Sequence, residues 1–271
     1  MRIVPSRNGW RWIADGARIF ARGPFAWILA VFGYWGIMLA AKLLPQVGTV
    51  IVTLLVPAFS VSFMALARET EAGRRAAPTM LFEGFRAHLP VLVLLGALYL
   101  ASLVAVLALS ALADGGLLAK WMIAGEPPGD DVPHAKLMLG SLVATALYTP
   151  VLAAFWFAPV LAAWEHMPPV KSLFYSFFAV WRNWRAFLVY SVSLVAVSIP
   201  VFLLFSFALT AFTKLAGGVA ASPEEQMAAG LLAAAPLLLA AASVLLASFY
   251  ASYRDIFPPD APVTAGALMA P

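Results

Sequence analysis

Six long stretches of the chain consist almost entirely of apolar residues, and short polar segments separate them. Each stretch has roughly 20 residues or more, the length that an α-helix needs to cross about 30 Å of hydrocarbon. The pattern predicts an all-α membrane protein with six transmembrane helices, arranged as three hairpins. The predicted spans are approximately residues 25–44, 47–67, 90–113, 137–164, 186–212 and 227–251.

Residues 6–23, in front of the first span, have the spacing of an amphipathic helix. Arginines such as Arg11 and Arg18 fall on one side of this helix, whereas Trp12 and Ile19 fall on the other. A basic face opposite an apolar face with tryptophan suits a helix in the plane of a membrane interface. A helix on a soluble surface is the plainer alternative, but the span that follows at once favours the interface.

Similar amphipathic segments precede the second and third hairpins, at 79–89 and 172–190. The first two segments share an acid-Gly-x-Arg core, Asp15 to Arg18 in one and Glu83 to Arg86 in the other. The third segment lacks the acid and the glycine, so its place in the repeat depends on layout alone. We therefore predict three similar thirds, each opened by an amphipathic interfacial helix.

We expect residues 1–254 to form a single integral membrane domain. The longest connection, 114–136, combines an irregular, solvated part at Glu126 to Asp131 with an apolar part at Leu117 to Ile123, which suits the membrane surface. Residues 255–271 are rich in proline and show little periodicity, so we predict a disordered cytoplasmic tail.

Composition makes lipid the solvent for most of this chain. Hydrophobic residues make up 63% and charged residues 11% of the sequence, and the mean hydropathy is +0.91. In soluble globular domains about 25% of residues are charged. The absence of cysteine excludes disulfides and thiolate metal sites.

Basic residues predict the orientation. Six spans place both termini on one side of the membrane, and of the 17 basic residues only Lys42, Lys120, Lys136 and Lys214 fall on the other side. Because short cytoplasmic loops carry an excess of Lys and Arg, we expect both termini in the cytoplasm and the chain in a bacterial inner membrane. The net charge of +4 is explained in this way, and no nucleic-acid partner is expected.

The middle of every predicted span lacks ionisable residues. A charge there costs about 2.5 to 3.5 kcal/mol on insertion scales and usually serves a proton relay, an ion site or a catalytic pair. His88, His166 and Glu165 are the one conceivable metal cluster, and ordinary interfacial histidines are the plainer interpretation. The sequence has no His-Glu-x-x-His, Gly-x-Ser-x-Gly or glycine-rich phosphate loop. We therefore expect no enzymatic activity, no cofactor and no metal.

Prolines inside the predicted spans keep a second role open. They occur at Pro57, Pro150, Pro200 and Pro236. A broken helix frees backbone carbonyls that can line a solute path. Packed helices also tolerate such prolines, with nearby hydroxyls bonding the freed carbonyls. The structural interpretation is favoured, and a transporter or channel for a small or amphiphilic solute is the alternative to a binding role.

The basic cytoplasmic face is the candidate recognition surface. Each Lys or Arg near an anionic leaflet contributes about 1 kcal/mol of attraction, although the same charges could serve only to set topology. We expect membrane lipids as partners, together with another membrane protein or a second copy of the chain. The residues predicted to contact anionic lipid or a partner are Arg11, Arg18, Arg22, Arg74, Arg75, Arg86, Arg182 and Arg185.

Two stretches carry a resemblance to known proteins: Trp12 to Phe20 before Pro24, and Arg182 to Tyr190 before the fifth span. These stretches are similar to those of a family of proteobacterial inner-membrane proteins of unknown function, and the resemblance extends over nearly the whole chain. More distantly, the alternation of interfacial helix and hairpin is similar to the membrane domain of some bacterial glycerophosphodiester phosphodiesterases. The sequence has no catalytic domain of that kind, so the resemblance does not imply their activity.

Overall fold

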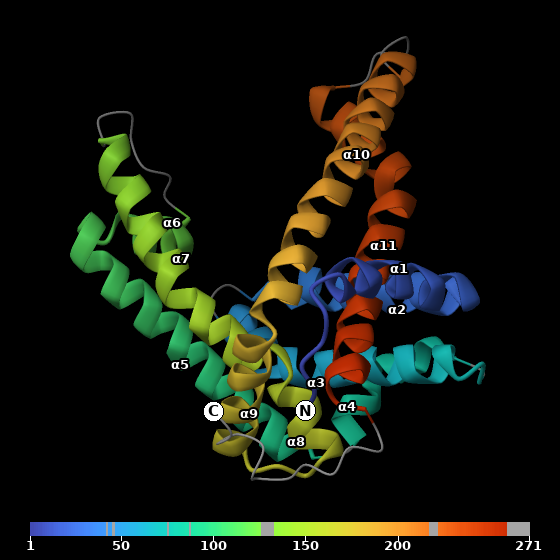
Figure 1. Ribbon diagram of the computed structural model, residues 1–271. Helices are drawn as coiled ribbons and strands as arrows, with labels where there is room; N and C mark the ends of the chain where they lie inside the picture. Colours follow the sequence, from blue (N-terminus) through green and yellow to red (C-terminus); the bar gives the residue numbers. More distant parts are fainter. Residues whose placement is uncertain are drawn as a thin grey trace. The chain divides into compact units, whose positions relative to one another are not determined.

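The computed structural model describes residues 1–41, 43–44, 47–74, 76–86, 88–125, 133–216 and 222–258. Within these ranges every regular element is a helix, and six helical segments are long and apolar enough to cross a membrane (Figure 1). The predicted all-α membrane fold is therefore confirmed. The six segments are α2 (Pro24–Ala41), α3 (Val47–Glu71), α5 (Leu89–Asp114), α7 (His134–Trp156) followed by α8 (Ala158–Trp164), α10 (Trp184–Ala216) and α11 (Pro223–Ile256).

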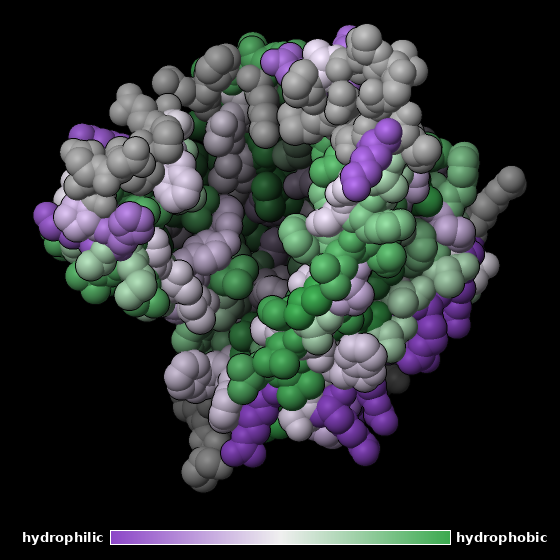
Figure 2. Space-filling model, turned by 90° about the horizontal axis from the view of Figure 1, so that it is seen from above, coloured by the Kyte–Doolittle hydropathy of each residue, from purple (hydrophilic) through white to green (hydrophobic). Residues whose placement is uncertain are grey.

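The outward surface of these helices is largely apolar. Figure 2 shows hydrophobic side chains over much of the visible face and hydrophilic ones in small groups near its edge. Leu112 on α5 is 85% exposed, Phe207 on α10 is 73% exposed and Leu232 on α11 is 75% exposed. Large apolar side chains exposed along helices of this length fit lipid as the solvent.

The segment before the second hairpin differs from the helix predicted over 79–89. A 3-10 turn (Pro78–Phe82) leads into the single-turn helix α4 (Glu83–Arg86). His88 then takes a left-handed backbone conformation with φ of 57°. A left-handed residue ends a right-handed helix, so α4 does not continue into α5.

Contacts divide the chain into two compact units. The chain passes from one unit to the other after residues 39, 61, 83 and 181. The single domain that the sequence predicts over 1–254 stays a prediction. Unit 1 comprises Met1–Leu39, Ser62–Glu83 and Arg182–Pro271, and unit 2 comprises Ala40–Val61 and Gly84–Trp181.

In unit 1 the amphipathic helix α1 (Asn8–Arg22) packs on α10 and α11. Trp12 is 1% exposed, and its ring lies 5.2 Å from that of Phe187 and 5.7 Å from that of Tyr190. Ile13 and Ile19 on the same face are also buried. The sequence predicts that this apolar face meets the membrane interface, and the structure corrects that point. The face is covered by two spanning helices.

Two glycines allow this close packing. A Cβ atom at Gly9 would lie 2.2 Å from the carbonyl oxygen of Ala186 on α10. A Cβ atom at Gly16 would lie 2.6 Å from the carbonyl oxygen of Val244 on α11. These distances are too short for any side chain, and small residues let helix backbones approach in this way.

The core of unit 2 joins the first half of α3 to α5 and α8. Its buried residues are Ala58, Val61, Leu92, Leu95, Ala158, Ala162 and Ala163. At Gly96 on α5 a Cβ atom would lie 2.2 Å from the carbonyl oxygen of Leu54 on α3. The backbones of these two helices are therefore in direct contact.

The fourth predicted span consists of two helices. α7 continues through Pro150, whereas the helix breaks at Phe157, two residues before Pro159. The hydroxyl of Ser176, on α9 (Pro169–Arg182), accepts a hydrogen bond of 2.9 Å from the N–H of Phe157 and donates one of 2.8 Å to the carbonyl of Ala153. A side chain from a neighbouring helix thus satisfies the backbone at the break.

The last helix begins a few residues before the predicted span of 227–251 and ends after it. Ser222 and Glu225 form a capping box at the start of α11. The helix continues to Ile256, so Asp255 and Ile256, which the sequence places in a disordered tail, are helical. Residues 259–271, the remainder of that predicted tail, lie outside the described residues.

Candidate functional site

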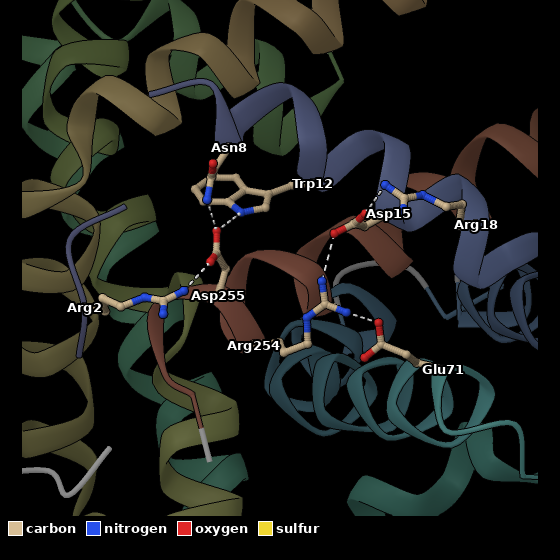
Figure 3. Close-up of polar contacts among 8 residues, drawn as sticks. All are labelled: Arg2, Asn8, Trp12, Asp15, Arg18, Glu71, Arg254 and Asp255. Atoms are coloured by element: carbon tan, nitrogen blue, oxygen red, sulfur yellow. Dashed lines mark hydrogen bonds and ion pairs between the residues drawn. The ribbon is translucent and has the colours of Figure 1, made fainter. Parts of the chain in front are cut away.

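Asp255, on the last turn of α11, accepts hydrogen bonds from three side chains near the N-terminus (Figure 3). Its Oδ1 accepts from Arg2 Nη2 at 3.0 Å, and its Oδ2 accepts from Asn8 Nδ2 at 2.7 Å and from Trp12 Nε1 at 3.0 Å. The indole is buried, so its N–H would be left unsatisfied without this carboxylate. The C-terminal end of α11 is therefore joined to the N-terminal segment and to α1.

The preceding residue, Arg254, bridges two carboxylates. Its Nη2 lies 2.8 Å from Asp15 Oδ2 on α1, and its Nη1 donates to Glu71 at the end of α3 (Figure 3). Asp15 also pairs with Arg18 at 2.6 Å. Arg22 Nη1 donates to the backbone carbonyl of Glu71 at 2.6 Å. This arginine–carboxylate network, defined by these five residues, connects α1, α3 and α11.

Helix ends explain why the charges lie where they do. Arg254 is in the last turn of α11, where a cation interacts favourably with the negative end of the helix dipole. Glu71 has the unfavourable position at the end of α3, but two arginines contact it. The side chains of Asp15 and Glu71 are 19% and 24% exposed, so the ion pairs are partly shielded from water.

Asn183, between α9 and α10, holds the chain before α1. Its Oδ1 accepts from the N–H of Val4 at 2.8 Å, and its Nδ2 donates to the carbonyl of Arg2 at 3.2 Å. The side chain is almost fully buried. Farther along α10, the hydroxyls of Tyr190 and Ser248 share a hydrogen bond of 2.6 Å that joins α10 to α11. Polar groups thus fix α1 and the segment before it against the last hairpin.

The outward face of α1 carries the predicted contact residues of that helix. Arg11, Arg18 and Arg22 are exposed, and so are Arg7 and the indole of Trp10, which is 51% exposed. Arg18 and Arg22 also take part in the arginine–carboxylate network. Neither Arg7 nor Arg11 forms a side-chain ion pair with a described residue. We call these four arginines and Trp10 the basic face.

The other predicted contact residues are more dispersed. Arg74 pairs with Glu69 at 2.5 and 2.7 Å, and this hydrogen bond raises the pKa of Arg74. Arg185 is exposed, with its guanidinium 5.5 Å from the ring of Trp184. Arg182 is half-buried at the end of α9. Arg86 is exposed on α4 and belongs to unit 2, whereas the other described members belong to unit 1. Arg75 lies outside the described residues.

Two members of the conceivable metal cluster, His88 and His166, lie side by side. The rings of His88 and His166 lie 4.6 Å apart, edge to face. In the part of the chain that the structure describes, no three Asp, Glu, His or Cys side chains lie close enough together to hold a metal ion.

Unit 2 contains a cavity of about 540 Å³. Helix α6 (Leu117–Ala124) and the facing sides of α5 and α7 form its walls. The lining is mainly aliphatic, with two tyrosines, Ser141 and Thr145 as its polar members. The lining residues are Tyr99, Leu103, Val106, Leu107, Leu118, Met122, Ser141, Ala144, Thr145 and Tyr148.

Comparison with known proteins gives one relative. A protein of Burkholderia thailandensis, named a probable inner membrane protein, is 39% identical over 261 residues, which are 94% of this chain and 92% of the relative. The chain belongs to the family of this inner membrane protein. No family model matches the chain, and no solved structure matches it. The resemblance to the membrane domain of phosphodiesterases stays a prediction.

As an inner membrane protein, the chain spans the membrane several times with the six apolar segments described above. Helix α1 packs on the start of α10, at Ala186 and Tyr190, and on the second half of α11, at Val244 and Ser248.

Sequence reasoning missed the residues that fix α1. The sequence places Asp255 in a disordered tail and Asn183 on the polar side of an amphipathic segment. In the sequence Arg254 and Glu71 are ordinary loop charges. The one available signal was the pair of glycines on the apolar face of α1, because small residues on a helix face indicate a close neighbour.

Proposed function

We propose that this chain is a non-enzymatic inner-membrane protein that binds anionic lipid head groups through its basic face, on the cytoplasmic side. One observation carries the proposal: α1 has its apolar face fixed on α10 and α11, and Arg7, Arg11 and Trp10 point outward. A helix held in this way keeps its arginines in place. Because the helix is already ordered, little of the free energy of lipid binding is spent on ordering it.

The chemistry of the basic face suits phosphate. A guanidinium forms two parallel hydrogen bonds with phosphate oxygens, and each basic residue near an anionic leaflet contributes about 1 kcal/mol. Arg7 and Arg11 are one helical turn apart, so one head group can contact both. Trp10 beside them suits the head-group layer, where tryptophan is enriched.

The test uses the full-length protein in nanodiscs that contain phosphatidylcholine with a minor share of phosphatidylglycerol. The measured quantity is the ratio of the two lipids that remain bound in native mass spectrometry. The Arg7→Gln/Arg11→Gln variant should lose preference for phosphatidylglycerol by about 30-fold, because the two arginines together contribute about 2 kcal/mol.

The matched control is Lys120→Gln/Lys136→Gln, which removes the same charge from exposed residues at the other predicted side. This control should keep the preference of the unchanged protein. Equal loss in both variants, or no preference in the unchanged protein, would contradict the proposal.

A second candidate is a transporter for a small or amphiphilic solute. The cavity between α5, α6 and α7 favours it, because a carrier needs a site inside its membrane-spanning part. Contacts with another membrane protein or with a second copy of the chain remain expectations.

A further inference from the structure

The cavity in unit 2 has the size and the lining of a site for a lipid-soluble molecule. Its volume of about 540 Å³ lies within the range of about 300–1,000 Å³ that is typical of ligand pockets. Among the residues that the structure describes, no Asp, Glu, Lys, Arg or His lines it. A charged ligand would have no counter-charge there, and an unpaired charge at membrane depth is costly.

A pair of tyrosines supplies the main polar feature. The hydroxyls of Tyr99 and Tyr148 share one hydrogen bond of 2.7 Å, and both side chains line the cavity. Two phenols carry two protons, and one shared bond uses one of them. No other hydrogen bond joins either hydroxyl to a described residue. One O–H therefore remains to donate to an acceptor.

This donor lies deep in the protein's spanning part. Tyr99 is near the middle of α5, and Tyr148 is in the second half of α7. A hydroxyl without an acceptor in an apolar environment costs about 1–3 kcal/mol or more. An alkyl chain would fill the cavity but would leave this O–H unpaired. A molecule with an accepting oxygen would satisfy it.

Helix α6 is held against the cavity by a buried carboxylate. Asp114 is 2% exposed, and its two oxygens accept from the N–H of Gly116 at 2.7 Å and of Leu118 at 2.9 Å. It also packs on Gly140, where a Cβ atom would lie 2.4 Å from its Oδ2. Leu118 and Met122 of α6 line the cavity, and Met122 is 67% exposed, so the cavity opens beside α6.

We propose that this cavity binds an uncharged, lipid-soluble molecule with a carbonyl oxygen, an aryl ketone or a quinone in chemical class, which accepts a hydrogen bond from the Tyr99–Tyr148 pair. The proposal is independent of the basic face, because the cavity belongs to unit 2 and Arg7 and Arg11 belong to unit 1. Binding at this site is also the first requirement of the transporter alternative.

The test uses benzophenone, a neutral aryl ketone that reacts on irradiation with nearby C–H bonds. The full-length protein in nanodiscs is irradiated with the probe, and labelled peptides are identified by mass spectrometry. We expect labels concentrated on the cavity-lining parts of α5, α6 and α7. Ala144→Phe, which fills the cavity, should reduce this labelling at least five-fold, whereas Tyr34→Phe, a tyrosine of α2 in unit 1, should not change it.

Competition tests the hydrogen bond itself. Fluorenone and fluorene share a ring frame, and only fluorenone has a carbonyl. Fluorenone should displace benzophenone at about five-fold lower concentration than fluorene does, since one net hydrogen bond has about that effect. In Tyr99→Phe/Tyr148→Phe the two competitors should become equal. Labelling spread evenly over all apolar helices, or equal competition in the unchanged protein, would overturn the proposal.

Discussion

The indole Nε1 of Trp12 donates a hydrogen bond of 3.0 Å to Oδ2 of Asp255, across a sequence separation of 243 residues. This contact joins the first helix of the chain to the last turn of the last one. It changes the role of α1. The helix is not a free amphipathic segment, because its apolar face is part of a protein core and only its basic face is outward.

Removal of the Asp255 carboxylate should destabilise unit 1. In Asp255→Ala the buried N–H of Trp12 and the amide of Asn8 lose their acceptor, which should cost about 2–3 kcal/mol of unfolding free energy. The measurement is denaturant unfolding of the purified protein in detergent. Glu224→Ala, an exposed acid at the other end of α11, should cost less than 1 kcal/mol. A similar cost for both variants would contradict the assigned role of Asp255.

Gly16→Ala should separate α1 from α11. The new methyl group would meet the backbone of Val244 and Ser248, which cannot move without shifting a spanning helix. We expect a loss of about 1–3 kcal/mol and faster tryptic cleavage after Arg18 and Arg22. Gly36→Ala in α2 is the control, because nothing lies within 4 Å of its added Cβ atom. The idea fails if α1 stays as resistant to trypsin in Gly16→Ala as in the control.

Arg254 should be coupled energetically to Asp15. The Arg254→Met variant leaves two acids near each other without their shared cation, so we expect a loss of about 1–3 kcal/mol. In a double-mutant cycle with Asp15→Asn, the interaction energy should be about 1 kcal/mol. The unfolding free energies of the four proteins give this value. Strict additivity would mean that the Arg254–Asp15 ion pair contributes no net stability.

Asp114→Ala should loosen α6. The N–H groups of Gly116 and Leu118 lose their acceptors, so hydrogen exchange of the α6 amides should become faster by at least five-fold. Ser110→Ala is a suitable control, since this buried hydroxyl bonds only to the carbonyl of Leu107 among the described residues. Unchanged exchange in α6 would show that other contacts hold the helix over the cavity.

The spans could be predicted from the sequence because the need for about 20 apolar residues comes from the thickness of the hydrocarbon layer and not from contacts within the protein. Predicted and observed ends differ by a few residues: the first span ends at Ala41 and not at 44, and the last continues to Ile256 and not to 251. The uneven distribution of basic residues between the two sides predicts that both termini are cytoplasmic. That orientation is still a prediction.

The contacts around α1 could not be predicted, because the meaning of a polar residue depends on its tertiary neighbours. Asp255 is an ordinary tail acid in the sequence and the acceptor for a buried indole in the structure. The periodicity around Trp12 predicts an apolar face but not whether lipid or protein covers it. The same is true of Asp114, which looks like a loop acid and is buried against Gly140.

The proposed binding of anionic lipid depends most on the side of the membrane where the basic face lies, since the cytoplasmic leaflet carries the negative surface potential. The chain contains no cysteine, so single cysteines can be placed at Arg11 and Lys120 and probed with a membrane-impermeant maleimide. In spheroplasts with an intact inner membrane, Lys120→Cys should be labelled at once and Arg11→Cys only after permeabilisation. Labelling of Arg11→Cys from outside would contradict the cytoplasmic basic face.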